Sequence, residues 1–184
     1  MKLHIGCGKR YLEGFKHVDK CKYEHIDYIC DIINLDTCFQ ENSVDEIYAC
    51  HVFEHIGRHE IDSCLSVLHA ILKPGGIIRI AVPDIEKVIK LYNSGTPLFP
   101  TLYGLLWGGQ KNDLDYHSIG FDFQTLASFL SKHGFDHIDK YDWKTFLPDQ
   151  FDDYSRCYIP HMDFENGELM SLNVIAKKEV LCFK

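Results

Sequence analysis

Short apolar runs recur along the chain, and several of them have a glycine, histidine or acidic residue at or near their carboxyl end. Each has the length and the apolar content of a β-strand. IIRIAVPD (77 to 84) is apolar almost throughout, which is typical of a strand buried on both faces of a parallel sheet. The other predicted strands are KLHIG (2 to 6), HVDK (17 to 20), HIDYICDI (25 to 32), DEIYACHV (45 to 52), HIDKYDW (137 to 143) and SLNVIAKK (171 to 178).

Two segments between these strands carry a helical period instead. Apolar residues at positions 61, 64, 65, 68, 71 and 72 repeat every three to four residues, and KPGG then ends the predicted helix. FDFQTLASFLSKHGF (121 to 135) predicts a second helix that ends at Gly134. Strands that alternate with helices predict an α/β fold with an open, mostly parallel, twisted sheet of about seven strands.

The first two connections between strands are short. Residues 9 to 15 and 20 to 24 leave too little chain for the crossover helices that usually join parallel strands. One face of the sheet beside the first strands should therefore be thinly covered. We expect the segment 143 to 170 or a second subunit to hide that apolar surface, so a homodimer is one expectation.

Composition narrows the class of protein. The chain has 184 residues, the usual size of one domain, with 19 basic and 27 acidic side chains, so nothing electrostatic favours nucleic acid. No apolar run approaches the length of a membrane span, and a strand that begins at Lys2 leaves no room for a signal peptide. We therefore expect a cytoplasmic protein. Its eight cysteines form no CxxC pair and are expected to be reduced.

The residues that follow the predicted strands are the first candidates for a binding site, because ligands of open α/β sheets bind at the carboxyl ends of the strands. A nicotinamide dinucleotide is disfavoured, since Tyr11 occupies the third glycine position of the dinucleotide fingerprint. S-adenosylmethionine (SAM) lacks phosphates and offers an amino-acid end, a ribose diol and an adenine amine to such residues. The candidates are Gly6, Cys7, Gly8, Asp19, Asp31, His51 and Asp84.

The ordered motifs LHIGCGKRYLEGFKHVDK, CDI, NSVDEIYACHVFEHI and LKPGGIIRIAVPD resemble those of class I, Rossmann-like SAM-dependent methyltransferases. In particular they resemble a short group that occurs near genes for polysaccharide synthesis. The resemblance implies that Gly6 and Gly8 approach the methionine part of SAM and that Asp19 accepts from the ribose hydroxyls. It also implies that Asp31 and Ile32 hold the adenine, and that His51 and Val52 line the sulfonium side. Their neighbours Cys7 and Lys20 are included in the expected cofactor site.

Two long segments, 85 to 120 and 143 to 170, have no regular pattern and are expected to be lid-like insertions that form a substrate-side cap. Their aromatic and acidic residues suit a small-molecule or glycan acceptor. The expected substrate contacts are Trp107, Tyr116, Asp152, Asp153 and Tyr154. Methyl transfer is an in-line displacement, and a hydroxyl acceptor needs a base, for which we expect His117 or His161.

HVFEH (51 to 55) matches the zinc-peptidase signature HxxEH letter for letter. A metal-dependent hydrolase that uses His51 and His55, with Glu54 and His59, is thus one alternative. A predicted strand runs directly into the motif, however, so the two histidines are not expected to share a helical turn, and we expect no metal. Two further alternatives are a SAM-binding interaction module without catalysis and a nicotinamide oxidoreductase.

Overall fold

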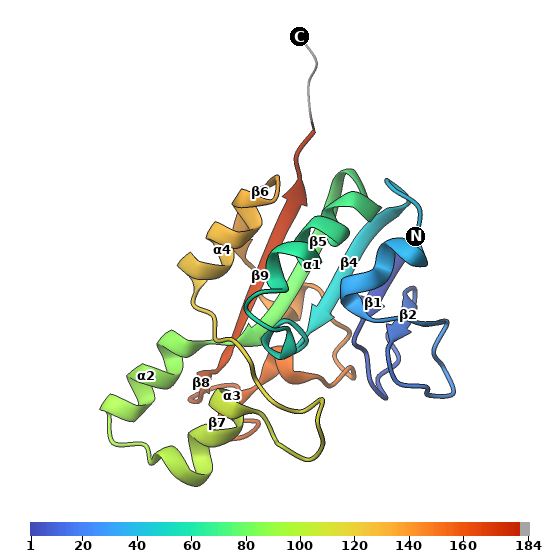
Figure 1. Ribbon diagram of the computed structural model, residues 1–184. Helices are drawn as coiled ribbons and strands as arrows, with labels where there is room; N and C mark the ends of the chain where they lie inside the picture. The colour runs from blue at the N-terminus through green and yellow to red at the C-terminus, as the bar shows by residue number, and fades with distance from the viewer. Residues whose placement is uncertain (181–184) are drawn as a thin grey trace.

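A seven-stranded sheet forms the centre of the molecule in the computed structural model, which describes residues 1–180 (Figure 1). The strand order is β3-β2-β1-β4-β5-β9-β6, and only β9 runs antiparallel to its neighbours. This order confirms the predicted Rossmann-like, mostly parallel sheet. The strands are β1 (Lys2–Ile5), β2 (Lys16–Asp19), β3 (Tyr28–Ile29), β4 (Val44–Cys50), β5 (Leu72–Pro83), β6 (Phe135–Lys140) and β9 (Ser171–Lys178).

Both predicted helices lie on one face of this sheet. They are α1 (Ile61–Ile71) and α4 (Phe123–Lys132), and the 3-10 turn η1 (Ile32–Thr37) covers the same face beside β1 (Figure 1). Helix α1 buries the apolar positions that its period of three to four residues selects. These side chains pack against the apolar residues of β1, β4 and β5 in the main core. None of the helices within residues 1–180 is sufficiently long and apolar to span a bilayer.

The opposite face is covered without regular helices. Tyr48 of β4 points to this side and packs with Leu12, Trp143, Leu147 and Phe151 in a second apolar cluster. Three of these residues belong to the segment 143–170, and no helix joins β1 to β2 or β2 to β3, as the short connections predicted. The segment 143–170 therefore hides the surface that missing crossover helices would have left open, and a homodimer stays a prediction.

Strand β3 is much shorter than the predicted strand 25 to 32. Asp27 lies just before it and accepts a hydrogen bond from the backbone N–H of His17 at 2.8 Å, which ties the incoming loop to β2. Asp31 lies just after it and accepts from the N–H of Ile33, so the chain turns into η1. Both carboxylates accept from backbone N–H groups and so compete with the hydrogen bonds of the sheet. Only Tyr28 and Ile29 therefore pair with β2.

Regular elements also occur where the sequence pattern predicted none. Asp84 is the N-cap of α2 (Ile85–Asn93) and accepts from the N–H groups of Glu86 and Lys87. The chain then forms the π-helical turn η3 (Leu98–Leu102) and α3 (Tyr103–Trp107), while β7 (Tyr158–Ile159) and β8 (Glu168–Leu169) form a hairpin. Val88, Leu102 and Met170 join these pieces in a third, small apolar cluster. Asp84, the acid that follows β5, is thus a helix cap.

A histidine in β1 makes the stability of the fold sensitive to acid. The ring of His4 is 1% exposed and lies 5.2 Å from the ring of Tyr48 and 6.0 Å from that of Phe151. Burial, and next the charge of His17, lowers the pKa of His4 to about 3. Histidine in an unfolded chain titrates near 6.5. The unfolded state therefore takes up the proton first, and stability present above about pH 6.5 is lost as the pH falls toward 3.

We expect His4→Phe to remove part of this acid sensitivity. Between pH 7.5 and pH 5.0 the free energy of unfolding of the native chain should fall by about 2 kcal/mol more than that of the variant. Urea unfolding at the two pH values measures the difference. The exposed His161 provides the control, because His161→Gln should lose as much stability as the native chain. An equal loss in His4→Phe would show that His4 does not titrate on unfolding.

Candidate functional site

A cavity of about 520 Å³ opens at the carboxyl ends of β1, β2 and β4. This is the edge at which open parallel sheets bind their ligands, and the volume is in the usual range for small-molecule sites. Most of the residues expected at the cofactor line this cavity. They are Gly6, Asp19, Lys20, Asp31, Ile32, His51 and Val52.

The loop after β1 and the acid after β2 are held together by backbone hydrogen bonds. Gly6 has a φ of +62°, and a Cβ atom there would lie 2.4 Å from Cγ2 of Val52, so only glycine fits. Asp19 accepts from the N–H of Gly8 at 2.8 Å and from the N–H of Cys21 at 2.7 Å. Both carboxylate oxygens of Asp19 are thereby fixed on the cavity wall. Gly8 supports this carboxylate and is not itself a lining residue.

Cys7, between the two glycines, is buried and lies outside the lining of the cavity. Burial, with the charge of Asp19 next, raises the pKa of the Cys7 thiol to about 12. The thiol is therefore neutral and acts as a small packing group.

The far end of the cavity combines one carboxylate with an apolar surface. Asp31 caps η1 and lies 3.4 Å from the ammonium group of Lys20, measured from Oδ2 to Nζ. Ile32 and Ile33 follow on the same wall. An acceptor group beside branched apolar side chains suits a flat ring that carries an amino group.

His51 lies where β4 enters the cavity and is held by three different parts of the chain. Its backbone has a φ of +55°, and its N–H donates to the carbonyl of Ala81 at 2.7 Å. Its Nδ1 lies 3.1 Å from Oε1 of Glu54, and its Nε2 lies 3.4 Å from Oγ of Ser171. The ring of Tyr154 lies 5.3 Å from the His51 ring. The imidazole is consequently fixed at the end of the cavity next to Gly6 and Val52.

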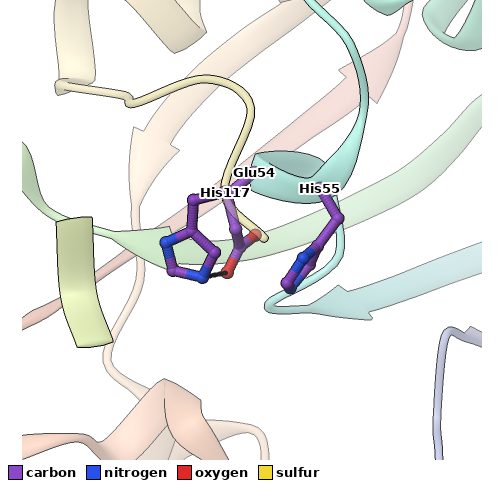
Figure 2. A group of neighbouring side chains, drawn as sticks. All are labelled: Glu54, His55 and His117. Atoms are coloured by element: carbon purple, nitrogen blue, oxygen red, sulfur yellow. Dashed lines mark ion pairs between the residues drawn. The ribbon is translucent and has the colours of Figure 1, made fainter. Parts of the chain in front are cut away.

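A second group of side chains adjoins this end, and we call it the Glu54–His55–His117 cluster (Figure 2). Glu54 and His55 belong to the 3-10 turn η2 (Phe53–His55), whereas His117 comes from the loop before α4. One potential ligand atom from each lies within 4.8 Å of the others. The Glu54 Oε1 atom is 4.0 Å from Nε2 of His117, and His55 also lines the cavity.

Burial and charge set the protonation of this cluster. Burial alone would raise the pKa of Glu54, but the contact with His51, and next the charge of His55, outweigh it and lower that pKa. Burial, partly offset by the charge of Glu54, lowers the pKa of His117. At neutral pH the cluster therefore contains an ionised carboxylate beside a neutral imidazole.

The sequence of residues 8–80 matches a family model described as a methyltransferase domain. This part of the chain is therefore similar to methyltransferase domains. The matched part includes β2, β3, β4 and most of β5, and with them Gly8, Asp19, Asp31 and His51. No curated protein matches the sequence.

Solved structures of methyltransferases share the fold of the domain. A SAM-dependent methyltransferase from Archaeoglobus fulgidus is 17% identical, with 96% of this chain and 85% of that chain covered and a TM-score of 0.56. A SAM-dependent methyltransferase from Methanosarcina mazei is 15% identical, with 98% and 92% covered and a TM-score of 0.58.

The 1,6-didemethyltoxoflavin-N1-methyltransferase of Burkholderia thailandensis, solved with its substrate and S-adenosylhomocysteine, is 17% identical, with 97% and 71% covered and a TM-score of 0.58. The family model and these structures support the expected enzyme class, a SAM-dependent methyltransferase, and the expected cofactor. The narrower likeness to proteins encoded near polysaccharide-synthesis genes stays a prediction.

The residues expected to contact substrate in the methyltransferase domain lie in different environments. The ring of Tyr154 is tilted by 43° against that of His51, and the backbone carbonyl of Tyr116 lies 3.0 Å from Nδ1 of His55. Trp107 lies apart, in a separate hollow with Phe99 and Tyr103. His161 is exposed and lines neither this hollow nor the main cavity.

The two neighbouring acids of the segment 143–170, Asp152 and Asp153, differ in burial. Asp152 is exposed, and its backbone carbonyl accepts from Nε of Arg10 at 2.8 Å. Asp153 is 4% exposed and accepts from the hydroxyl of Tyr48 and from the N–H and hydroxyl of Ser155. The Asp153 side chain thus joins the segment to β4, which favours a structural role.

Sequence reasoning missed part of the cavity wall. Residues Asn112 to Asp115 of the loop after α3 line the cavity, as do Tyr23 and Glu60. Asp115 holds this loop in shape, because its carboxylate accepts from the N–H groups of Gly109 and Lys111 at 3.3 Å. The only signal in the sequence was the length of the segment 85 to 120, which pointed to a loop at the ligand edge without selecting residues.

The residues of the HxxEH motif do not lie on an α-helix. His51 lies in a left-handed backbone conformation at the exit of β4, and His55 ends a 3-10 turn. The expectation that His51 and His55 do not share a regular helical turn is confirmed. In this fold Glu54 and His55 fasten the turn to the loop before α4, because the Glu54 carbonyl accepts from the N–H of Ser118 at 2.7 Å.

Proposed function

We propose that this methyltransferase transfers the methyl group of SAM to a hydroxyl group of a small-molecule or saccharide acceptor. The proposal rests on two features that adjoin at one end of the cavity. His51 and Val52 line the cavity, and the Glu54–His55–His117 cluster begins two residues further along the chain. A methyl donor and a group able to activate an acceptor would therefore meet there.

The rest of the cavity supports SAM in a single orientation. Asp19, with both oxygens fixed, is placed to accept from the ribose hydroxyls. Asp31 and Ile32 offer an acceptor and an apolar wall to the adenine. The amino-acid end and the sulfonium then fall beside Gly6, Val52 and His51. We propose these contacts for the whole expected cofactor site, with Cys7, Gly8 and Lys20 supporting the residues that touch SAM.

The acceptor would enter at the His51 end. Tyr154 and Tyr116 are exposed side chains near this end, and their rings offer a surface to an apolar or sugar ring. The acceptor hydroxyl loses its proton at the Glu54–His55–His117 cluster. Of the two histidines expected to act as base, His117 is the better placed, since His161 lies in an exposed turn away from the cavity. Catalysis would come largely from holding oxygen and methyl in line.

The Burkholderia thailandensis methyltransferase supports a small-molecule acceptor, because it is solved with 1,6-didemethyltoxoflavin and S-adenosylhomocysteine together. A saccharide is the second form of the same proposal, and acceptor screening separates the two.

Two measurements test the proposal. In calorimetry, S-adenosylhomocysteine should bind the purified chain with micromolar affinity, whereas NAD should not bind. Gly6→Ala should weaken this binding at least tenfold, because the added Cβ overlaps Val52 and the backbone is left-handed. Labelled SAM is then offered with small alcohols, phenols and sugars. If S-adenosylhomocysteine does not bind, or binds Gly6→Ala equally well, the cofactor site is misplaced. If it binds and no acceptor is labelled, the chain is a non-catalytic SAM-binding module.

A further inference from the structure

We propose that Glu54, His55 and His117 bind a divalent transition-metal cation beside the methyl-transfer end of the cavity, and that this cation holds the acceptor oxygen. The set differs from the HxxEH interpretation, which relied on His51 and His55. It joins a turn after β4 to a loop before α4, and the three side chains face one another (Figure 2). Among residues 1–180 it is the group of histidine, cysteine and acidic side chains with ligand atoms close enough to hold one ion.

The strongest reason is a buried carboxylate that lacks hydrogen bonds. Glu54 is 1% exposed, and neither Oε1 nor Oε2 has a hydrogen-bond partner within the described chain. The nearest polar group is Nδ1 of His51, 3.1 Å from Oε1, and Oε2 has no close partner. A buried ionised group without donors is costly, and coordination of a cation is one of the few ways to stabilise it.

Both histidines are already held in the form that a cation requires. Nδ1 of His55 lies 3.0 Å from the carbonyl of Tyr116, and Nδ1 of His117 lies 3.1 Å from the carbonyl of Leu105. A carbonyl oxygen only accepts, so Nδ1 of each ring carries a proton and Nε2 of each ring is left for a cation. This second contact, from imidazole to backbone carbonyl, is the usual support of metal-binding histidines.

The donor set defines the class of cation. Two imidazoles and one carboxylate suit zinc and the neighbouring first-row ions rather than calcium or magnesium, which prefer oxygen. Ligand atoms around such an ion stand about 3 to 3.5 Å apart. The cluster, with ligand atoms within 4.8 Å, would have to close by up to about 1.5 Å, which side-chain rotation can supply. Three protein ligands leave coordination positions on the ion open for oxygen atoms of other molecules.

The chemical role of the cation rests on the proposed function. His55 lines the cavity, so an ion at the cluster would be reached from it. An acceptor hydroxyl bound to the ion loses its proton to water more easily. The oxygen then attacks the methyl carbon, the C–O bond forms as the S–CH₃ bond breaks, and the sulfonium becomes the neutral thioether of S-adenosylhomocysteine. With the ion bound, His117 is a ligand of the ion, and water takes the proton in place of the His117 imidazole.

Cobalt is a suitable probe, because Co²⁺ in such a site absorbs visible light. The untagged chain is stripped with a chelator and titrated with Co²⁺, and we expect one ion per chain and a visible absorption band. His55→Gln and His117→Gln should each weaken Co²⁺ binding at least tenfold, and the double variant should abolish the band. His59→Gln is the matched control, since His59 is exposed, lies close in sequence and is outside the cluster.

Circular dichroism confirms that each variant is folded. Calorimetry with S-adenosylhomocysteine on the stripped variants separates the two proposals, because cofactor binding should survive loss of the cation. Catechol, a diol that coordinates through oxygen, should shift the band of the native chain. No stoichiometric Co²⁺, or binding that is equal in His55→Gln, His117→Gln and His59→Gln, would overturn the metal site. A band that catechol leaves unchanged would overturn the role of the ion in holding the acceptor.

Discussion

Replacing Asp19 with alanine is expected to weaken binding of S-adenosylhomocysteine by about 100-fold to 1,000-fold, because it removes two charge-assisted hydrogen bonds to a ribose diol. The carboxylate lines the cavity and is fixed by the N–H groups of Gly8 and Cys21. Alanine would also release both N–H groups and loosen the loop after β1. Isothermal titration calorimetry measures the change.

Two companion variants isolate the carboxylate. Asp19→Asn keeps the shape but loses the charge and one acceptor, so its affinity should lie between those of the native chain and Asp19→Ala. Glu24→Ala removes an exposed acid of the following loop and should bind as the native chain does. If Asp19→Asn and the native chain bind equally, the ribose does not depend on this carboxylate.

Asp153→Ala is expected to lower the free energy of unfolding by about 3 to 4 kcal/mol, because it leaves buried donors without their acceptor. Asp153 accepts from the hydroxyl of Tyr48 and from the N–H and hydroxyl of Ser155. Asn173 extends this network by donating to the carbonyl of Ser155 at 2.8 Å. Thermal unfolding should show a midpoint lower by about 10 °C.

Asp152→Ala is the matched control, since its side chain is exposed, and it should unfold as the native chain does. Binding of S-adenosylhomocysteine to folded Asp153→Ala should be nearly unchanged at low temperature. An unaltered unfolding midpoint, combined with a raised acceptor KM, would instead assign Asp153 to substrate binding.

The sheet and the cofactor edge could be predicted because both depend on local patterns. Alternating apolar runs mark strands, and the carboxyl ends of parallel strands meet at one edge wherever each strand lies in the sheet. Asp19, Asp31 and His51 were therefore expected close together before any strand order was known, and all three line one cavity. Asp84 met the same criterion, yet its carboxylate caps α2, because a helix cap and a ligand contact use the same residue type.

For the long segments without a hydrophobic period, only the approximate position in the fold could be predicted. The segment 143–170 packs its aromatic residues onto the face beside β1 and β4, where no crossover helix competes for that surface. The segment 85–120 supplies α2, α3 and the loop Asn112 to Asp115 on the cavity wall. Such packing depends on which surfaces remain free, and this follows from the assembled sheet.

By itself, the sequence determined the α/β class, the edge of the sheet at which the cavity lies, and the absence of helices after β1 and β2. Each of these follows from hydrophobic period, chain length or residue type over a few neighbouring positions. Only the tertiary structure decided that His117 meets Glu54 and His55, and that Asp153 is buried under Tyr48. Those contacts join residues far apart in the chain, and their distances are set by the packing of whole elements.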